Sequence, residues 1–441
     1  MSAVSKRSAS DLREFLAALD ERGWLARIDR RVGDGLELAS TLYQLQQRGQ
    51  AAVFEHVWDS AFKVAGNVIV NRDMLALALG CSRDDTQRLW LSKLRQRIEP
   101  RLVNGGPVKE VRLIGDEARL SALPIVQHAA KDAGPYITAG VVITRDPDSG
   151  KRNLSFNRMM YRSEREAGMR MMPSQQLGEI QNRVEQAGQP LEVAVAIGLH
   201  PCQLLAAAAS LPPGDDELAL AGALHDAPVE LVKCETVDLE APAAAEIVLE
   251  GEILPGVRER EGPFGDFMQF YTPVVESNVF RLRAITHRRG AYYHTIHAGT
   301  DDDMSLLAPS REAEIFEAVE RAGSRVKTLS LMPTILGCVI AIEKRYEGEA
   351  KNVAMAAFGA YRWLKVCVVV DHDVDVFNMS DVWWAMVTRG RADTGVFVIA
   401  DAMGFPRERD PFMIHQGKLG IDATIPLGQW EHFERKTTLR S

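Results

Sequence analysis

Three charged residues in two short motifs could form a catalytic acid–base set. Arg158 closes the motif Asn153-Leu-Ser-Phe-Asn-Arg158, and two acids bound the motif Glu261-Gly-Pro-Phe-Gly-Asp266. Because glycine and proline between these acids break helices, the acids do not share a helix face. Carboxylates held near an arginine can differ in proton affinity, which general acid–base catalysis requires. A surface ion pair beside a turn would use the same residue types.

The residues after Asp266 favour the catalytic interpretation. Four of them are apolar or aromatic: Phe267, Met268, Phe270 and Tyr271. Such neighbours remove water from a carboxyl group and favour its neutral form, as a proton donor needs. Glu261 instead ends the charged run Arg258-Glu-Arg-Glu261.

Asn153 and Arg158 set a geometric requirement. In a regular strand, residues five positions apart face opposite sides. If both side chains serve one site, the segment must therefore contain a bulge or a bend. The alternative is a simple edge strand with an exposed arginine.

Glu217 has the position of a helix-capping acid or of a metal ligand. It follows the turn Pro212-Pro-Gly-Asp-Asp216 and precedes the apolar run Leu218-Ala-Leu-Ala-Gly222. A carboxylate in the first turn of a helix is stabilised by the helix dipole. The functional alternative is a hard oxygen ligand for a divalent cation that bridges to a phosphate.

Other polar motifs carry weaker signals. His294 and His297 lack helical metal-binding spacing, so we predict pocket or packing roles for them. The run Asp301-Asp-Asp303 is expected to be a solvated turn. The chain has neither a Gly-x-Gly-x-x-Gly loop after a strand nor a P-loop motif, which argues against a Rossmann dehydrogenase or a P-loop enzyme.

The five cysteines are scattered and include no Cys-x-x-Cys pair: Cys81, Cys202, Cys234, Cys338 and Cys367. This pattern argues against a disulfide framework or a zinc site and fits a reducing cytoplasm. The chain starts with a polar segment, and no run reaches the ~18 apolar residues of a membrane span. We therefore expect a soluble cytoplasmic protein.

Length, composition and pattern together predict an α+β fold of several domains. The chain has 441 residues, of which 46% are hydrophobic and 25% charged, and its net charge of −8 argues against a nucleic-acid partner. Mixed helix and strand signals indicate an N-terminal α/β domain over residues 1–115. Closely spaced strands indicate a barrel-like domain over 116–305. A linking helix over 306–325, beginning near Pro309, and a C-terminal α/β domain over 326–441 follow. The barrel strands are predicted at 140–145, 191–198, 229–234, 246–253, 280–285 and 291–297.

The motifs also carry a family resemblance. Residues 232–251 contain Val-Lys-Cys, Asp-Leu-Glu-Ala-Pro and Ala-Glu-Ile-Val-Leu-Glu-Gly in order, and they lead into Glu261–Asp266. Joined to Asn153 and Arg158, this pattern resembles the UbiD family of decarboxylases, which use prenylated FMN. The resemblance runs from about residue 10 to 430. It implies a split-barrel flavin domain between two α/β domains, the last of which forms a homodimer or homohexamer.

The resemblance implies catalytic roles for three residues. Arg158, Glu261 and Asp266 match the family's arginine and acid pair, although some members carry Glu at the position of Asp266. Asp266 would give a proton to the carbon that loses CO₂. Arg158 would hold the substrate carboxylate and keep Glu261 ionised.

The resemblance also implies a metal-bound cofactor. The family holds the flavin phosphate through Mn²⁺ or Mg²⁺ bound by Asn, His and Glu, and K⁺ is a further expected cation. Asn153 and Glu217 match the first and third ligands, whereas Gln176 stands where the family has His. A Gln carbonyl oxygen is a neutral, harder ligand that can bind either ion. The residues expected at the cofactor are Asn153, Phe156, Asn157, Arg158, Gln175, Gln176, Glu217 and Lys365.

The implied activity is that of a carboxy-lyase. It would be reversible, non-oxidative decarboxylation of an aromatic, heteroaromatic or α,β-unsaturated carboxylic acid, with the cofactor supplied by a flavin prenyltransferase. Two alternatives stay open. One is a UbiD-like non-catalytic or subunit protein in which Gln176 weakens cofactor binding. The other is a carboxylase component that runs the same chemistry toward acid synthesis.

Overall fold

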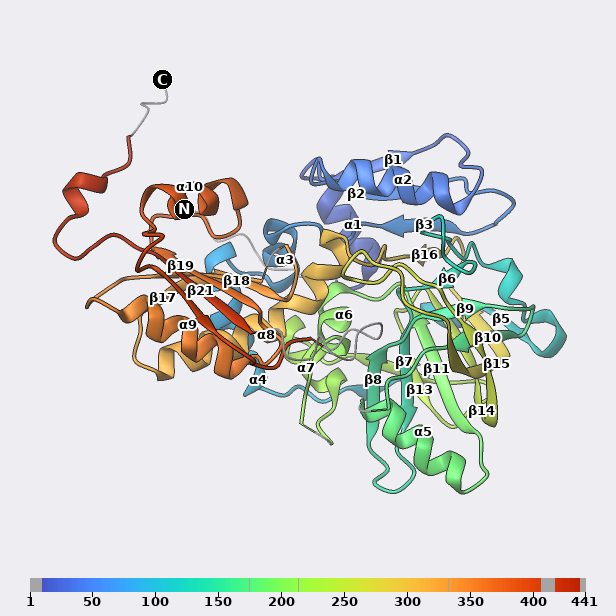
Figure 1. Ribbon diagram of the computed structural model, residues 1–441. Helices are drawn as coiled ribbons and strands as arrows, with labels where there is room; N and C mark the ends of the chain where they lie inside the picture. The colour runs from blue at the N-terminus through green and yellow to red at the C-terminus, as the bar shows by residue number, and fades with distance from the viewer. Residues whose placement is uncertain (1–9, 174, 213, 332, 406–416, 437–441) are drawn as a thin grey trace. The chain divides into compact units, whose positions relative to one another are not determined.

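The computed structural model describes residues 10–173, 175–212, 214–331, 333–405 and 417–436 (Figure 1). Its helices are α1 (Leu12–Asp20), α2 (Gly35–Gln46), α3 (Arg72–Leu79), α4 (Thr86–Leu94), α5 (Gln176–Gln186), α6 (Pro201–Ala207), α7 (Glu217–His225), α8 (Asp301–Arg321), α9 (Glu349–Ala360) and α10 (Met379–Thr388). Its strands are β1 (Leu25–Ile28), β2 (Ala51–Phe54), β3 (Lys63–Gly66), β4 (Arg101–Leu102), β5 (Val111–Ile114), β6 (Tyr136–Ile137), β7 (Val141–Arg145), β8 (Arg152–Phe156), β9 (Met159–Tyr161), β10 (Glu166–Met169), β11 (Leu191–Ile197), β12 (Glu230–Lys233), β13 (Glu240–Pro242), β14 (Ile247–Glu261), β15 (Val275–His287), β16 (Tyr292–His294), β17 (Val326–Ser330), β18 (Gly337–Ile342), β19 (Val366–Asp371), β20 (Val396–Ile399) and β21 (Lys418–Ala423).

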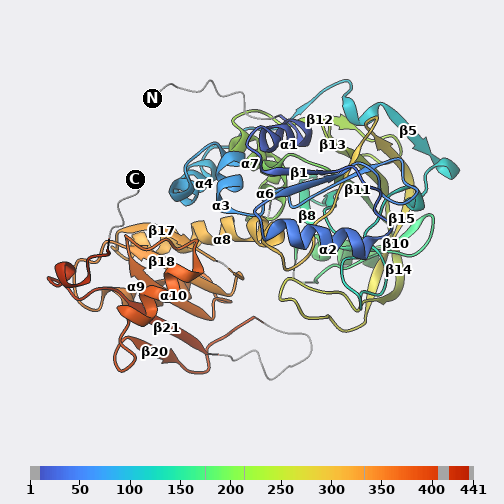
Figure 2. The ribbon, with the colours of Figure 1, turned by 90° about the horizontal axis from the view of Figure 1, so that it is seen from above.

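The chain folds into two compact units. One unit comprises Met1–Arg83 and Ser92–Leu306, and the other comprises Asp84–Leu91 and Leu307–Ser441. The first unit contains a four-stranded sheet in the order β1-β2-β3-β16, a nine-stranded sheet, and a small sheet in the order β13-β12-β4. Helices α1 and α2 flank β1 and β2 (Figure 2).

The nine-stranded sheet must curl. Its order is β6-β9-β10-β15-β14-β11-β7-β8, with β5 on β15. β8 at one edge is joined to β9 near the other edge by only Asn157 and Arg158. In a flat sheet six strand spacings of ~4.8 Å would separate them by ~29 Å, but this link spans at most ~11 Å. The sheet therefore rolls into an open barrel, which confirms the predicted split barrel and α+β fold.

The barrel is filled by alternating side chains. Val193, Val195 and Ile197 of β11 point to one face and join Leu249 and Phe280 in a single buried core. Residues two apart in a strand share a face, so these three form one face of β11. The alternate residues Ala194 and Ala196 are buried as well, so β11 is covered on both faces. The predicted barrel strands agree with β7, β11, β14 and β15. Two predicted barrel strands belong elsewhere: β12 lies in the small sheet with β13 and β4, and β16 pairs in parallel with β3 of the four-stranded sheet.

Two local predictions are wrong. Asp301–Asp303 is not a solvated turn but the first turn of α8, and Asp302 is buried there and accepts the Ile69 N–H at 2.8 Å. The helix predicted to begin near Pro309 begins at Asp301 and carries Pro309 inside it. Acidic residues suit the first turn of a helix, whereas the local preference of Pro309 against a helix interior is overridden in α8. Within the described residues, no helix is long and apolar enough to cross a bilayer.

The second unit is a five-stranded sheet in the order β17-β18-β19-β21-β20. Val368 and Val370 of β19 pack with Val382 and Ala385 of α10. The alternate β19 residues point to the other face, and α9 also packs on β19 and β21. The sheet is therefore covered on both faces, as the near-continuous apolar run of β19 requires (Figure 1).

We expect Glu246→Ala to destabilise the first unit by about 3 kcal/mol, because it removes the partner of a buried ion pair. The Glu246 side chain is fully buried, and its two carboxylate oxygens accept hydrogen bonds from Arg13 Nε and Nη2, each at 2.8 Å. This contact holds α1 against the residue that precedes barrel strand β14. Urea unfolding measures the loss. Asp20→Ala is the control, since its pair with Arg27 is largely exposed and should contribute less than ~1 kcal/mol. Equal losses in the two variants would contradict this account.

Candidate active site

Arg158 and Glu261 form a buried bidentate ion pair. They are 103 residues apart in the chain, one in the β8–β9 link and the other at the end of β14. Arg158 Nε donates to Glu261 Oε1 at 2.9 Å, and Nη2 donates to Oε2 at 3.0 Å. The Glu261 side chain has no exposed surface, whereas 18% of the Arg158 side chain is exposed. Two parallel charge-assisted bonds fix the guanidinium plane and leave further N–H donors for another partner.

The β8–β9 link also meets the geometric requirement set by the sequence. β8 ends at Phe156, and Asn157 and Arg158 lie outside both strands. Asn157 closes this corner, because its amide donates to the Arg170 carbonyl at 3.0 Å and its oxygen accepts from Ser155 Oγ at 2.8 Å. Asn153 and Arg158 are therefore not on opposite sides of one unbent strand.

Aromatic rings cover the ion pair. The Arg158 guanidinium lies 4.6 Å from the centre of the Phe264 ring, and the Tyr136 ring lies 4.7 Å from Phe264. Burial and the neighbouring Glu261 carboxylate raise the pKa of Tyr136 above its ordinary value, so the phenol stays neutral. Apart from the Tyr136 hydroxyl, the two rings are apolar. This apolar cover lowers the local dielectric constant and so strengthens the attraction between Arg158 and Glu261.

Asp266 occupies a different environment from Glu261. Its backbone N–H donates to the Phe270 carbonyl at 2.9 Å, and its Oδ1 accepts the Met268 N–H at 2.9 Å. This tight turn lies between Gly265 and Tyr271, two residues beyond the Phe264 ring that contacts Arg158. The structure therefore pairs Glu261 with Arg158 and holds Asp266 by the backbone of its own turn. Two acids in such unlike surroundings suit separate roles in proton transfer.

Asp132 positions the loop that carries Asp266, residues 262–271, here called the acid loop. The sequence did not predict this role. Its Oδ1 accepts the Gly265 N–H at 2.8 Å, and its Oδ2 accepts the Ala129 N–H at 2.9 Å. Burial raises the pKa of Asp132, while these amides and the nearby Arg158 charge act in the opposite direction. Since its partners are backbone amides, no residue pattern could have revealed this role. The apolar run after Asp266 predicts a desolvated carboxyl group, but Asp266 is only half-buried and 53% of Phe270 is exposed.

A neutral polar wall lies beside the acid loop. His128 Nε2 is 2.8 Å from Thr295 Oγ1, and the His128 and His297 rings are 5.5 Å apart. Burial lowers the pKa of both histidines, so they are uncharged near neutral pH. The segment after His297 reaches the Asp266 turn, because Gln269 Nε2 donates to the Gly299 carbonyl at 3.1 Å. His294 is fully buried, and burial lowers its pKa to about 4.

Asn153 and Glu217 present buried oxygen atoms at neighbouring positions. Glu217 begins α7, as the capping turn before it predicts, and Asp216 is the N-cap. Glu217 Oε2 accepts the Leu154 N–H at 3.1 Å, next to Asn153. Asn153 Oδ1 is buried and accepts no hydrogen bond from the described residues. Burial raises the pKa of Glu217 to about 7. An orphaned amide oxygen beside a desolvated carboxyl group fits a hard divalent cation.

The remaining predicted cofactor residues occupy less specific positions. Gln176 is the half-buried first residue of α5, which packs on β8, and Gln175 is its exposed N-cap. Phe156 is the half-buried last residue of β8. Lys365 is exposed and belongs to the second unit. The cofactor roles of these four residues stay predictions.

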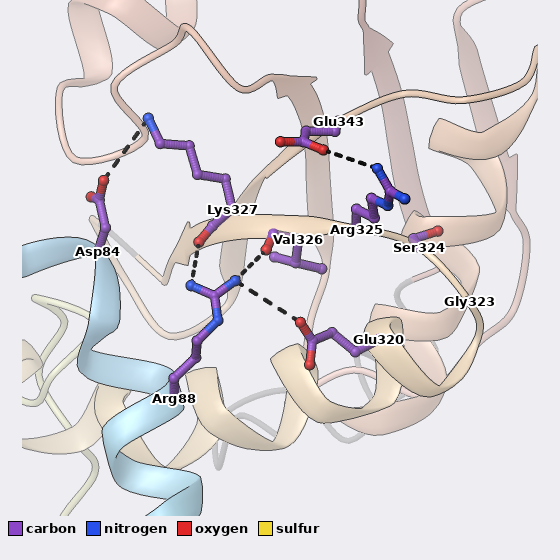
Figure 3. A pocket seen from close by; sticks show the side chains of 9 residues that line it. All are labelled: Asp84, Arg88, Glu320, Gly323, Ser324, Arg325, Val326, Lys327 and Glu343. Carbon is purple, nitrogen blue, oxygen red and sulfur yellow. Dashed lines mark hydrogen bonds and ion pairs between the residues drawn. The ribbon is translucent and has the colours of Figure 1, made fainter.

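A groove of about 590 Å³ in the second unit has a different character (Figure 3). Its charged side chains are paired with each other: Lys327 with Asp84, Arg325 with Glu343, and Arg88 with Glu320. Arg88 also donates to the Val326 carbonyl at 2.8 Å. Among the described residues, none of those predicted for the catalytic site lines this groove.

Fold and site together define a split-barrel protein in which a buried arginine–glutamate pair lies next to the loop that carries Asp266. Three family models match, described as the N-terminal, Rift-related and C-terminal domains of 3-octaprenyl-4-hydroxybenzoate carboxy-lyase, at residues 16–94, 101–301 and 305–423. The chain belongs to the UbiD family of carboxy-lyases. The predicted boundaries at 115, 305 and 325 stay predictions.

Individual relatives match over nearly the whole chain. The anhydromevalonate phosphate decarboxylase of Methanothermobacter thermautotrophicus is 35% identical over 96% of this chain and 99% of its own. The solved UbiD-class enzyme HmfF from Pelotomaculum thermopropionicum, in complex with FMN, has a TM-score of 0.92 at 41% identity and covers 97% of each chain. An evolved dimeric form of HmfF in complex with prFMN has a TM-score of 0.87 at 39% identity and covers 98% of this chain and 97% of its own. Apo 3,4-dihydroxybenzoic acid decarboxylase from Klebsiella pneumoniae has a TM-score of 0.90 at 26% identity and covers 98% of each chain.

Proposed function

We propose that this chain is a prenylated-FMN-dependent decarboxylase that removes CO₂ reversibly and without net oxidation from an aromatic or heteroaromatic acid. The observation that carries the proposal is the buried bidentate Arg158–Glu261 pair on the same loop system as Asp266. The FMN and prFMN complexes of HmfF support the cofactor. When bound, prenylated flavin supplies the electron sink for loss of the carboxylate.

The oxygen-rich pair Asn153 and Glu217 would hold the cofactor phosphate through Mn²⁺ or Mg²⁺, with Gln176 as a third, neutral ligand. Support comes from the orphaned Asn153 Oδ1 and the desolvated Glu217 carboxyl group. K⁺ would be a further cation at the phosphate.

The protein's own groups would do three jobs. Arg158 uses the donors that Glu261 leaves to hold the substrate carboxylate. Phe264 and Tyr136 exclude water from the pair. Asp266 delivers a proton to the carbon that lost CO₂ and takes it back in the reverse direction, while the Asp132 contact to Gly265 keeps the loop in place.

The neutral wall supports an aromatic or heteroaromatic acid over a phosphorylated one. His128, His297 and Thr295 carry no positive charge when the histidines are neutral, and a phosphate prefers cationic partners. Among the acids that relatives are named for, we therefore expect the substrate to resemble 3,4-dihydroxybenzoic acid more than anhydromevalonate phosphate.

The test is co-expression with a flavin prenyltransferase, followed by mass and absorbance spectra of the purified protein and a screen of acids. We expect bound prenylated FMN and CO₂ release from an aromatic or heteroaromatic acid. A second candidate function, a non-catalytic subunit, is favoured by the neutral Gln176 in place of His. Protein that stays free of flavin under manganese supplementation would support this second function and overturn the first.

We expect metal-free protein to lose about 3 kcal/mol of stability as pH rises from about 4.5 to 7, through Glu217. The pKa of Glu217 is higher in the folded state than in the unfolded state, so between these two values the folded state binds a proton that the unfolded state has lost. Raising the pH through this range therefore lowers the free energy of unfolding, and the loss is complete above the folded pKa. Urea unfolding against pH measures the slope. The Glu217→Gln variant should show little change of stability with pH over this range. The control Glu179→Gln, which removes an exposed acid in the first turn of α5, should keep the wild-type slope. Mn²⁺ should restore stability above pH 7 in the wild type and in Glu179→Gln, but not in Glu217→Gln.

We also propose a homo-oligomer, a homodimer or homohexamer, in the cytoplasm. Trp383 and Val387 of α10 are 62% and 60% exposed, and Val398 of β20 is 69% exposed. Apolar side chains gathered on one unit are typical of an interface. Light scattering of the purified protein would give the mass, and a monomer at micromolar concentration would contradict this proposal.

A further inference from the structure

Three side chains with soft or borderline ligand atoms converge outside the proposed flavin site. His200 is the N-cap of α6, Cys202 lies in its first turn, and His225 is the last residue of α7. One ligand atom from each lies within 4.8 Å of the other two. His200 and Cys202 are buried, and α3, α6 and α7 pack together in the first unit (Figures 1 and 2).

A fourth candidate ligand comes from the end of α3. Cys81 follows the C-cap Gly80 of that helix. Cys81 lies outside the group of three whose ligand atoms are within 4.8 Å of one another, so its thiol would have to approach the other ligands to complete a four-ligand set. Cys202 Sγ also reaches the Ala78 carbonyl of the same helix at 3.4 Å. Two thiols and two imidazoles are a common ligand set of structural zinc.

We propose that His200, Cys202 and His225, with Cys81 as fourth ligand, bind a thiophilic divalent cation such as Zn²⁺. This site is distinct from the oxygen ligands Asn153 and Glu217, which suit Mn²⁺ or Mg²⁺. Spacing along the chain argues against such a site, but the ligands come from the ends of three different helices. Helix packing therefore brings the ligand atoms together, as the short spacing of a Cys-x-x-Cys motif does in other zinc sites.

The chemistry of binding balances. Burial lowers the pKa of His200 to about 3 and also lowers that of His225, so both imidazoles are neutral at pH 7, as metal ligands must be. Each thiol gives up one proton to solvent, and two thiolates with one divalent cation are neutral overall, which suits a buried position. His200 Nδ1 accepts the Cys202 N–H at 3.1 Å and must exchange this bond for the metal. His200 should therefore contribute least to affinity.

Binding would also affect the proposed flavin site. α7 carries Glu217 at its first residue and His225 at its last. A cation that joins α7 to α3 and α6 would restrain the helix that presents Glu217. The cation is therefore expected to have a structural effect without touching the substrate.

The test uses Co²⁺ as a spectroscopic probe on the full chain after treatment with a chelator. We expect a single equivalent to produce thiolate-to-cobalt charge-transfer absorption and the visible bands of tetrahedral cobalt, and Zn²⁺ to abolish both by displacement. Cys202→Ala and His225→Gln should each weaken binding at least ~10-fold. Cys234→Ala, which removes a cysteine of the β12–β13 region, should leave the spectrum unchanged.

Two further variants make the outcome decisive. His200→Asn keeps a good N-cap for α6 while it removes the imidazole, so a loss of cobalt affinity without a loss of helix stability would support ligation. Glu217→Gln should abolish the Mn²⁺ response and leave the cobalt spectrum intact. Absence of thiolate absorption in the wild type, or its survival in both Cys202→Ala and His225→Gln, would overturn the proposal.

Discussion

Replacement of Asp266 by Asn is expected to lower the decarboxylation rate about 100- to 10,000-fold, the usual contribution of a general acid. Asparagine keeps the side-chain oxygen that accepts the Met268 N–H, so the turn should survive. It has no proton to give to the carbon that loses CO₂. Exchange of substrate hydrogen for deuterium should fall with decarboxylation, because both need the same proton transfer. Product formation and exchange measured by NMR test this directly.

Asp146→Asn is a matched control for this experiment. Asp146 Oδ1 accepts the N–H of Asp148, two residues on, in the same way that Asp266 accepts that of Met268. Its turn lies between β7 and β8, away from the acid loop. The control should keep wild-type turnover. Near wild-type decarboxylation and exchange in Asp266→Asn would show that another group donates the proton.

Glu261→Gln is expected to cause the second large loss, both in stability and in turnover. The variant leaves the Arg158 guanidinium without its charged partner, and breaking a buried ion pair costs about 3 kcal/mol. The guanidinium would also lose the two-point contact that fixes its plane. Since a shift of ~1 Å in a positioning group can cost ~100-fold in rate, turnover should fall by at least that factor.

The control for Glu261→Gln is the neighbouring acid on the same strand. Glu259 pairs with Arg162, but its side chain is 42% exposed, so Glu259→Gln should cost less than ~1 kcal/mol and keep activity. Urea unfolding and steady-state kinetics of the two variants give the comparison. If the two variants have similar urea midpoints and similar turnover, Glu261 contributes no more than a surface acid to stability or to catalysis.

Local rules were sufficient where the decisive contacts are local. The Pro-Pro-Gly-Asp-Asp turn predicts that a helix starts at Glu217, and α7 does start there because Asp216 caps the Leu218 N–H at 2.8 Å. Four barrel strands, β7, β11, β14 and β15, are likewise predicted by runs of apolar residues between turns. The Arg158–Glu261 contact spans 103 residues, so the residue types raised it as a possibility and the family resemblance supported it, but no local rule predicts it.

Other features have no local signature. Asp132 acts on backbone amides, which every residue type presents, so its sequence context carries no information about Gly265. Cys202 and His225 lie on different helices, and their proximity follows from helix packing. Pro309 is tolerated inside α8, although its local preference is against a helix interior. In each case the tertiary arrangement decides, and the sequence offers only residue types.

The short link between β8 and β9 fixes a distance within the proposed site. Asn153 lies in β8 and Arg158 lies in the link itself, five residues further on, so their Cα atoms are at most ~18 Å apart. One uninterrupted hexapeptide thus sets the spacing between the proposed phosphate anchor and the reacting end of the site. An insertion or deletion of a single residue would change that spacing and the closure of the barrel together. Natural variation in this hexapeptide should therefore consist of substitutions at constant length.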